Sequence, residues 1–91
     1  MMDETAFREE LQRDGYENVL VVNWEAGKVS PSHVHEFSAR GMLLSGAVTV
    51  KTDEVTMVCE KPGDRFALEA GTPHVESAGP DGAKMLIGRK F

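Results

Sequence analysis

The chain has 91 residues, enough for one domain and too few for two. Its 41% hydrophobic and 27% charged residues are typical of a globular protein in water. The net charge of -5, with no cluster of Lys and Arg, argues against a nucleic-acid partner. No apolar run approaches the ~20 residues of a membrane helix, and the acidic start MMDETAFREE is unlike a signal peptide. We therefore expect a cytoplasmic protein with no membrane partner.

Residues 3–14, DETAFREELQRD, predict the one good helix of the chain. Acidic side chains crowd its first turn, where they complement the helix dipole, and a glycine follows as a C-terminal stop. Phe7 and Leu11, four residues apart, form a short apolar stripe. We expect residues 1–15 to be a helical segment on the outside of a domain that spans residues 16–91.

After residue 15 the chain consists of short strand-like runs separated by turn residues. These runs are rich in β-branched and aromatic residues, and they are ENVLVVNWE, RGMLLSG, AVTVKT, VTMVCE, RFALE and AKMLIGRKF. Two of them flank Gly46 and predict a hairpin, and the last one follows the turn signal GPDG. Short strands with this turn spacing predict an all-β fold, either an antiparallel sandwich or a barrel.

The single cysteine, Cys59, lies in the alternating run VTMVCE. One cysteine cannot form an internal disulfide, which fits a reducing compartment. We interpret Cys59 as a small apolar strand residue rather than as a nucleophile.

Three histidines are the best candidates for chemistry. His33 and His35 occupy alternate positions in SHVHEF, and alternate residues of a strand project from the same face. His74 follows the turn GTP and opens the next segment. Imidazole is a common ligand for zinc, copper, iron and nickel, and three converging imidazoles make a typical open metal site. Spacing alone leaves a second interpretation open, in which His33 and His35 form a polar patch on a barrel rim.

The glycines and prolines around these histidines resemble the two sequence motifs of the cupin superfamily. The first motif is matched by Gly27, His33, His35 and Gly46. The second is matched by Gly63, Asp64, Ala70, Gly71, Thr72, Pro73 and His74. The resemblance covers residues 20–90 and implies a double-stranded β-helix, the cupin jelly-roll barrel. It also implies that His33, His35 and His74 meet inside the barrel on one divalent metal ion.

The chain departs from the cupin pattern at the metal site. The family usually supplies a glutamate ligand three or four residues after the second histidine. Counted back from Gly46 that position is Ala39, with Arg40 beside it, and neither residue is a carboxylate. In the second motif Glu69 replaces the usual proline and Ala78 the usual asparagine. Glu36 points away from the histidines on a regular strand, and only a bulge would redirect it. We therefore expect a three-histidine site, with Glu69 as the one other acid that an interior-facing motif position offers.

A three-histidine site implies an anionic ligand. Its imidazoles are neutral, so a divalent ion keeps most of its charge and favours a carboxylate or a thiolate. Ala39 and Gly41 are small and share the face of the histidines, which leaves room for that ligand. Iron, zinc, nickel, copper and manganese all suit such a site. The residues expected to line the pocket are Phe37, Ala39, Gly41, Leu43 and Phe66.

The strand face opposite the metal carries Met42 and Leu44. Apolar residues on both faces of a strand imply that either the N-terminal helix or a second subunit covers the outside. Because cupins commonly dimerise through such a face, we favour a homodimer. Arg40 and Arg65 are the basic residues nearest the motifs, and Arg40 should point outward and form a surface ion pair.

Three functions remain open, because the cupin fold serves many activities. The first is a metal-dependent enzyme of the dioxygenase type, since thiol dioxygenases of this superfamily use three histidines around iron. The second is a non-catalytic module that binds or senses a small anionic metabolite through the metal. The third is a metal-free structural barrel. Apart from the histidines and Glu69, the interior-facing motif positions offer no general base, which weakens a hydrolase or isomerase.

Overall fold

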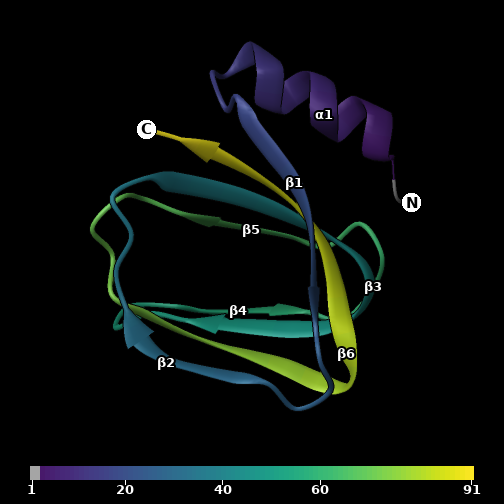
Figure 1. Ribbon diagram of the computed structural model, residues 1–91, viewed down its shortest axis with the longest axis vertical. Helices are drawn as coiled ribbons and strands as arrows, with labels where there is room; N and C mark the ends of the chain where they lie inside the picture. Colours follow the sequence, from purple (N-terminus) through teal and green to yellow (C-terminus); the bar gives the residue numbers. More distant parts are fainter. Residues whose placement is uncertain (1–2) are drawn as a thin grey trace.

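The computed structural model describes residues 3–91 (Figure 1). One helix and six strands follow one another: α1 (Glu4–Arg13), β1 (Asn18–Trp24), β2 (Val29–His33), β3 (Ser38–Lys51), β4 (Thr56–Cys59), β5 (Arg65–Leu68) and β6 (His74–Lys90). The all-β architecture with one short N-terminal helix confirms the predicted fold class. Residues 1 and 2 of the predicted helical segment lie outside the described residues.

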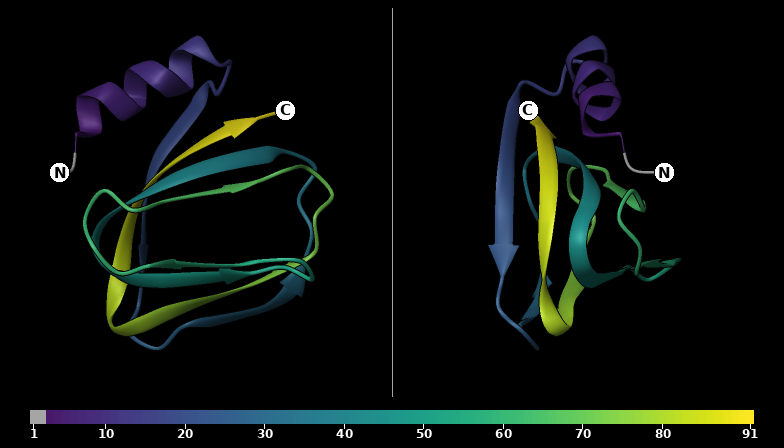
Figure 2. Two further views of the ribbon diagram at one scale, coloured as in Figure 1. Left: turned by 180° about the vertical axis from the view of Figure 1, so that it is seen from behind. Right: turned by 90° about the vertical axis from the view of Figure 1, so that its right-hand side faces the viewer.

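Two long strands, β3 and β6, organise the sheet. They pair antiparallel with each other from Ser38 opposite Lys90 to Lys51 opposite Val75. The strand order is β1-β6-β3-β4, with β2 also paired to β6 and β5 also paired to β3. Both long strands bend, so that their two halves run through opposite walls of a flattened barrel (Figure 1 and Figure 2). A single pair of strands therefore contributes to both walls.

β3 and β6 each continue without interruption through a place where the sequence predicts a turn. The hairpin predicted at Gly46 is wrong, because β3 continues through it, and the GPDG sequence lies within β6 rather than before it. Gly46 has a φ of 78°, and a side-chain carbon there would lie 2.1 Å from the carbonyl oxygen of Gly82. Glycine tolerates both conditions, so these turn-like residues mark the bend of two paired strands and not a chain reversal.

The barrel interior contains an apolar core. It consists of Leu43, Val48, Val50, Cys59, Phe66, Leu68, Ala83 and Met85. Cys59 is 1% exposed, and burial raises the pKa of its thiol, with a smaller effect from the charge of Asp64. Cys59 is therefore a core residue, as interpreted from the sequence.

Helix α1 begins and ends at residues that cap it. Asp3 accepts a hydrogen bond of 3.0 Å from the backbone N–H of Ala6 at the N-terminus. At the other end Gly15 has a φ of 86°, and the N–H of Tyr16 donates to the carbonyl of Leu11, the closing bond of a Schellman motif. With 10 residues, α1 has neither the length nor the apolarity to span a membrane, and residues 3–91 contain no other helix.

The helix, and not a second subunit, covers the outer face of β3. The contact is a second apolar cluster, here called the helix cluster, which consists of Phe7, Leu11, Tyr16, Met42 and Leu86, with Val19 and Leu44 packed against it. Met42 is 1% exposed within this one chain. Our preference for a dimer contact over Met42 and Leu44 is therefore wrong, because two helix residues spaced four apart already bury the face. Self-association itself stays a prediction, without an assigned surface.

Two ion pairs hold α1 against the barrel. Arg40 of β3 lies 2.5 Å from Asp14, and Arg65 of β5 lies 2.6 Å from Glu10. The outward orientation and surface ion pair predicted for Arg40 are confirmed. Hydrogen bonds from Arg13 and Arg40 lower the pKa of Asp14 to about 2. The helix is thus fixed by apolar packing in the centre and by charge pairs at the rim.

Candidate metal centre

Pairing between β2 and β6 brings two of the histidines together. His33, the last residue of β2, lies opposite His74, the first residue of β6, and Ser30 lies opposite Glu76. The ring centroids of His33 and His74 are 4.3 Å apart. These residues are distant in the sequence and meet only because the antiparallel ladder sets them side by side.

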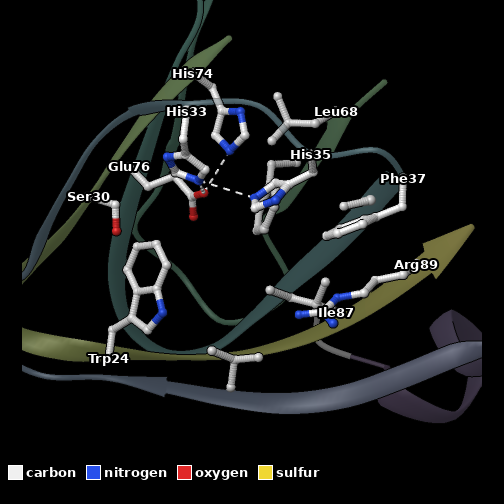
Figure 3. Close-up of a pocket in the computed structure, with 13 residues that line it drawn as sticks. Trp24, Ser30, His33, His35, Phe37, Leu68, His74, Glu76, Ile87 and Arg89 are labelled. Carbon is white, nitrogen blue, oxygen red and sulfur yellow. Dashed lines mark hydrogen bonds and ion pairs between the residues drawn. The ribbon is translucent and has the colours of Figure 1, made fainter. Parts of the chain in front are cut away.

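His35 lies beyond the end of β2, but its ring joins the same group. Its Nε2 atom lies 3.1 Å from Nε2 of His33, and its ring centroid lies 5.2 Å from that of His74. On the other side the ring stacks on Phe37, with centroids 4.6 Å apart. The structure thus brings together the three histidines that the sequence singled out (Figure 3).

A carboxylate that we did not foresee completes the group. Glu76 is 8% exposed, and its Oε1 lies 2.8 Å from Nε2 of His74 and 3.4 Å from Nε2 of His33. The expectation that no carboxylate stands beside the histidines is therefore wrong. Glu76 follows His74 by two residues on one strand, so the alternation that paired His33 with His35 could have found it. We call the four side chains the metal cluster.

The two acids that we weighed from the sequence, Glu36 and Glu69, lie elsewhere. Both are exposed, and they border a surface groove together with Ser38 and Ala70, outside the cavity that holds the histidines. Glu36 lies in the loop between β2 and β3 and does not turn inward. The carboxylate of the site therefore comes from the second histidine segment and not from the first.

Backbone carbonyls fix the proton on two of the imidazoles. Nδ1 of His33 lies 2.7 Å from the carbonyl oxygen of Pro31, and Nδ1 of His74 lies 2.9 Å from that of Thr72. Because a carbonyl oxygen only accepts, both Nδ1 atoms donate, and both Nε2 atoms face the cluster. Metal-binding histidines are commonly anchored in this way, which orients the ring and sets its tautomer.

The surroundings of His35 favour the neutral form of its imidazole. Burial lowers the pKa of its imidazole, and the charges of His33 and His74 lower it further, whereas Glu76 opposes the change. A neutral imidazole retains a lone pair that can bind a cation.

The ligand atoms of the metal cluster fit a metal ion. They all lie within 4.8 Å of one another. An ion with bonds of about 2.0–2.2 Å holds its ligand atoms up to roughly 4.4 Å apart, so small side-chain movements bring all four into contact. Three imidazole nitrogens and one carboxylate oxygen are donors that zinc, iron, nickel, copper and manganese accept in proteins.

The metal cluster borders a small cavity of about 180 Å³ inside the barrel (Figure 3). The other walls are mostly apolar and come from Val22, Trp24, Phe37, Ala39, Phe66, Leu68 and Ile87, with Ser30 and Arg89 as further polar groups. Such a cavity is far smaller than the about 300–1,000 Å³ of drug-sized ligand sites. It suits a small molecule that reaches the metal cluster.

Three of the residues that we expected at the pocket, Phe37, Ala39 and Phe66, line this cavity. Gly41 and Leu43 do not, and Leu43 belongs to the apolar core. A side-chain carbon on Gly41 would lie 2.2 Å from the ring of Phe66. The expectation that Gly41 leaves room for a ligand is therefore wrong, because Phe66 fills that space.

Comparison with known proteins identifies structures that are similar to this fold. No family model and no curated protein matches the sequence. KdgF from a Halomonas species is 25% identical, with a TM-score of 0.65 over 80% of this chain and 67% of KdgF. An RmlC-like cupin from Desulfovibrio desulfuricans is 21% identical, with a TM-score of 0.62 over 79% of this chain and 69% of that cupin.

A third similar structure belongs to a larger protein. The DMSP lyase DddQ from Ruegeria pomeroyi is 22% identical, with a TM-score of 0.71 over 80% of this chain. The match covers 37% of the lyase, so this chain spans little more than a third of that protein. The resemblance of the sequence to the cupin motifs and these structural likenesses agree, and the chain has the cupin jelly-roll fold.

Proposed function

We propose that this chain holds one divalent metal ion through His33, His35, His74 and Glu76 and uses it to bind a small anionic molecule. One observation supports this most strongly: the Nε2 atoms of His33 and His74 face a carboxylate while their Nδ1 protons are committed to backbone carbonyls. Nε2 of His35 lies close beside them. Lone pairs that converge in this way repel one another unless a cation lies between them, and a metal ion satisfies all four donors at once.

Glu76 lowers the net positive charge of the metal site that an anionic ligand would approach. Three neutral imidazoles and one carboxylate leave a divalent ion with one net positive charge, so an anion is still the favoured ligand. A bound ion would act as a Lewis acid that polarises an oxygen of the ligand. Iron, zinc, nickel, copper and manganese all remain candidates, because the donor set and the supply in the cell together decide the metal.

Catalysis is a second candidate, and Glu76 is the observation that favours it. A carboxylate beside the bound molecule can take up a proton, which removes our earlier objection that no interior acid could serve as a base. One similar structure is a lyase by name. We therefore test lyase chemistry beside the dioxygenase type expected from the sequence, with a non-catalytic sensing module as the alternative. A cytoplasmic homodimer stays part of the proposal.

Metal content tests the metal-binding proposal. Protein purified without a histidine tag or chelator should contain about one transition metal ion per chain by plasma mass spectrometry, directly or after reconstitution. The double variant His33→Ala/His35→Ala should remain folded and lose that metal. Full metal retention in the double variant, or no metal in the reconstituted wild type, would overturn the proposal in favour of a metal-free barrel.

The role of Glu76 has a matched control within the chain. Glu76→Gln should weaken zinc affinity at least about 10–100-fold, the loss that follows even from removing a group that only supports a metal ligand. Glu36→Gln changes an exposed glutamate outside the cavity and should leave zinc affinity unchanged. Equal affinities for the two variants would exclude Glu76 as a ligand.

A further inference from the structure

Arg89 differs from the other arginines among residues 3–91 in its surroundings. The remaining four each lie within 3.2 Å of an Asp or Glu oxygen, and they are Arg8, Arg13, Arg40 and Arg65. Arg89 forms no such pair within the described chain, and its Nε is buried there without a hydrogen-bond partner. In a chain with 15 acidic and 10 basic side chains, an arginine without a carboxylate points to a partner from outside.

The missing partner would lie in the cavity of the metal cluster. Arg89 projects from β6, where it is paired with Asn18 on one side and Ala39 on the other, and it lines the cavity. Figure 3 shows its guanidinium beside Ile87, with the histidines and Glu76 above it. The cation and the metal cluster therefore face one shared space.

The way in which Arg89 is held leaves its donors free. Its guanidinium carbon lies 4.8 Å from the centre of the Phe37 ring, a cation–π contact that uses none of its N–H donors. The N–H donors of a guanidinium point outward in its plane, and two of them match the two oxygens of a carboxylate. The contact with Phe37 thus holds the group without using its hydrogen bonds.

We propose that Arg89 binds the carboxylate of a short organic acid whose other end lies at the metal ion. The metal end of this assignment rests on the function proposed above. The cavity of about 180 Å³ limits the acid to a short carbon chain, which would contact apolar walls such as Trp24 and Ile87. A single guanidinium fork matches the two oxygens of a carboxylate.

The test compares an acid with its uncharged analogue on zinc-loaded protein. Succinate and succinamate differ in one end, a carboxylate against an amide, and isothermal titration measures both. Wild type should bind succinate about 10–100-fold more tightly, the range expected for a charge-assisted hydrogen-bonded pair. Arg89→Met keeps a side chain of similar reach over Phe37 and should remove that preference.

Arg65→Met is the matched control. The guanidinium of Arg65 also lies 4.8 Å above an aromatic ring, that of Phe7, but outside the cavity of the metal cluster. This variant should keep the preference for succinate. The proposal is overturned if Arg89→Met keeps the preference, or if wild type shows none with malonate, succinate or glutarate against their monoamides. Inorganic phosphate that binds as tightly as the dicarboxylates would overturn the assignment to carboxylates.

Zinc titration separates this proposal from the one on which it rests. Arg89→Met should bind zinc with the stoichiometry of wild type. If wild type binds no metal, the proposed function fails, and the metal-free chain is titrated with propionate and propionamide by NMR. A preference for propionate that Arg89→Met abolishes would still support the carboxylate role of Arg89. Equal responses to the two compounds would overturn it.

Discussion

The helix cluster and the cavity are both bounded by apolar side chains, but the charged groups beside them differ in whether they have a partner of opposite charge. Around the helix cluster, the cations of Arg40 and Arg65 are paired with acids of the helix segment. In the cavity, four side chains that can bind a metal crowd together, and the guanidinium of Arg89 has no anion among residues 3–91. The cations beside the helix cluster are paired within the chain, whereas the polar groups of the cavity would be stabilised by a bound metal ion and an anion.

This difference separates stability from binding. A polar group that is buried without a partner destabilises the folded state. The unpartnered groups of the cavity therefore lower the stability of the fold, and a bound ligand can offset this loss. The helix cluster carries no such cost and adds apolar burial to a small barrel. Substitutions in the helix cluster should therefore lower the stability of the fold and leave metal binding intact. Substitutions in the metal cluster should abolish metal binding without lowering the stability of the fold.

The largest stability effect is expected from Leu11→Ala. Leu11 is 0% exposed, and its side chain packs close over Gly88 of β6. Removing it should lower the free energy of unfolding by about 2–5 kcal/mol, measured by denaturant titration. Zinc stoichiometry should not change at temperatures where the variant is folded. A folded Leu11→Ala protein that has lost its metal would break the separation between the two regions, and the milder Leu11→Val provides the same readout if Leu11→Ala unfolds.

A smaller effect is expected from Gly41→Ala, which should change both stability and ligand binding. The added methyl group would meet the Phe66 ring, so Phe66 must move, and it lines the cavity. Overpacking of this kind should destabilise the chain by about 1–3 kcal/mol and weaken succinate binding while zinc is retained. Calorimetry measures the first effect and titration the second. Unchanged stability together with unchanged succinate affinity would show that the space beside Gly41 is not filled by Phe66.

The smallest effect is expected from Asp14→Asn, at the rim of the helix cluster. Hydrogen bonds from Arg13 and Arg40 hold the pKa of Asp14 at about 2, below its ordinary 3.8. A lowered pKa means that the carboxylate stabilises the fold above its ordinary pKa and loses this contribution as the pH falls towards about 2. Wild type should therefore exceed Asp14→Asn in stability at pH 7, with the gap closing between about pH 4 and pH 2.

Salt provides the control for the Asp14 prediction. Asp14 lies at the surface, so added salt should reduce the gap at pH 7. Denaturant midpoints of both proteins at several pH values measure it. A gap that widens on acidification would contradict the assigned role of Asp14.

Local patterns predicted the elements of this protein better than their connections. The helix followed from an acidic first turn, a terminal glycine and apolar residues spaced four apart, all of which act within one turn of chain. Gly46 and the GPDG sequence were misread as chain reversals. A glycine with positive φ is needed both in a tight turn and in the bend of a long strand, and only the partner strand distinguishes the two.

The candidate site shows the same limit. His33, His35 and His74 could be chosen from alternation and from motif spacing, because both are properties of short segments. Glu76 satisfies the same alternation rule, two residues after His74, whereas the cupin motif places its carboxylate at the position of Ala39. Nothing local marked Arg89, since an arginine near the end of a strand looks the same whether or not an acid lies beside it.

The amino-acid sequence by itself therefore determined the all-β class, the capped helix and the histidines, each encoded by neighbours in the chain. The tertiary structure alone decided that the helix covers Met42, that a carboxylate from β6 joins the histidines and that Arg89 has no acid partner among residues 3–91. The physical reason is that these outcomes depend on the register of β6 against β2 and β3. That register is set by burial of the whole sheet, so it is not encoded in any short segment.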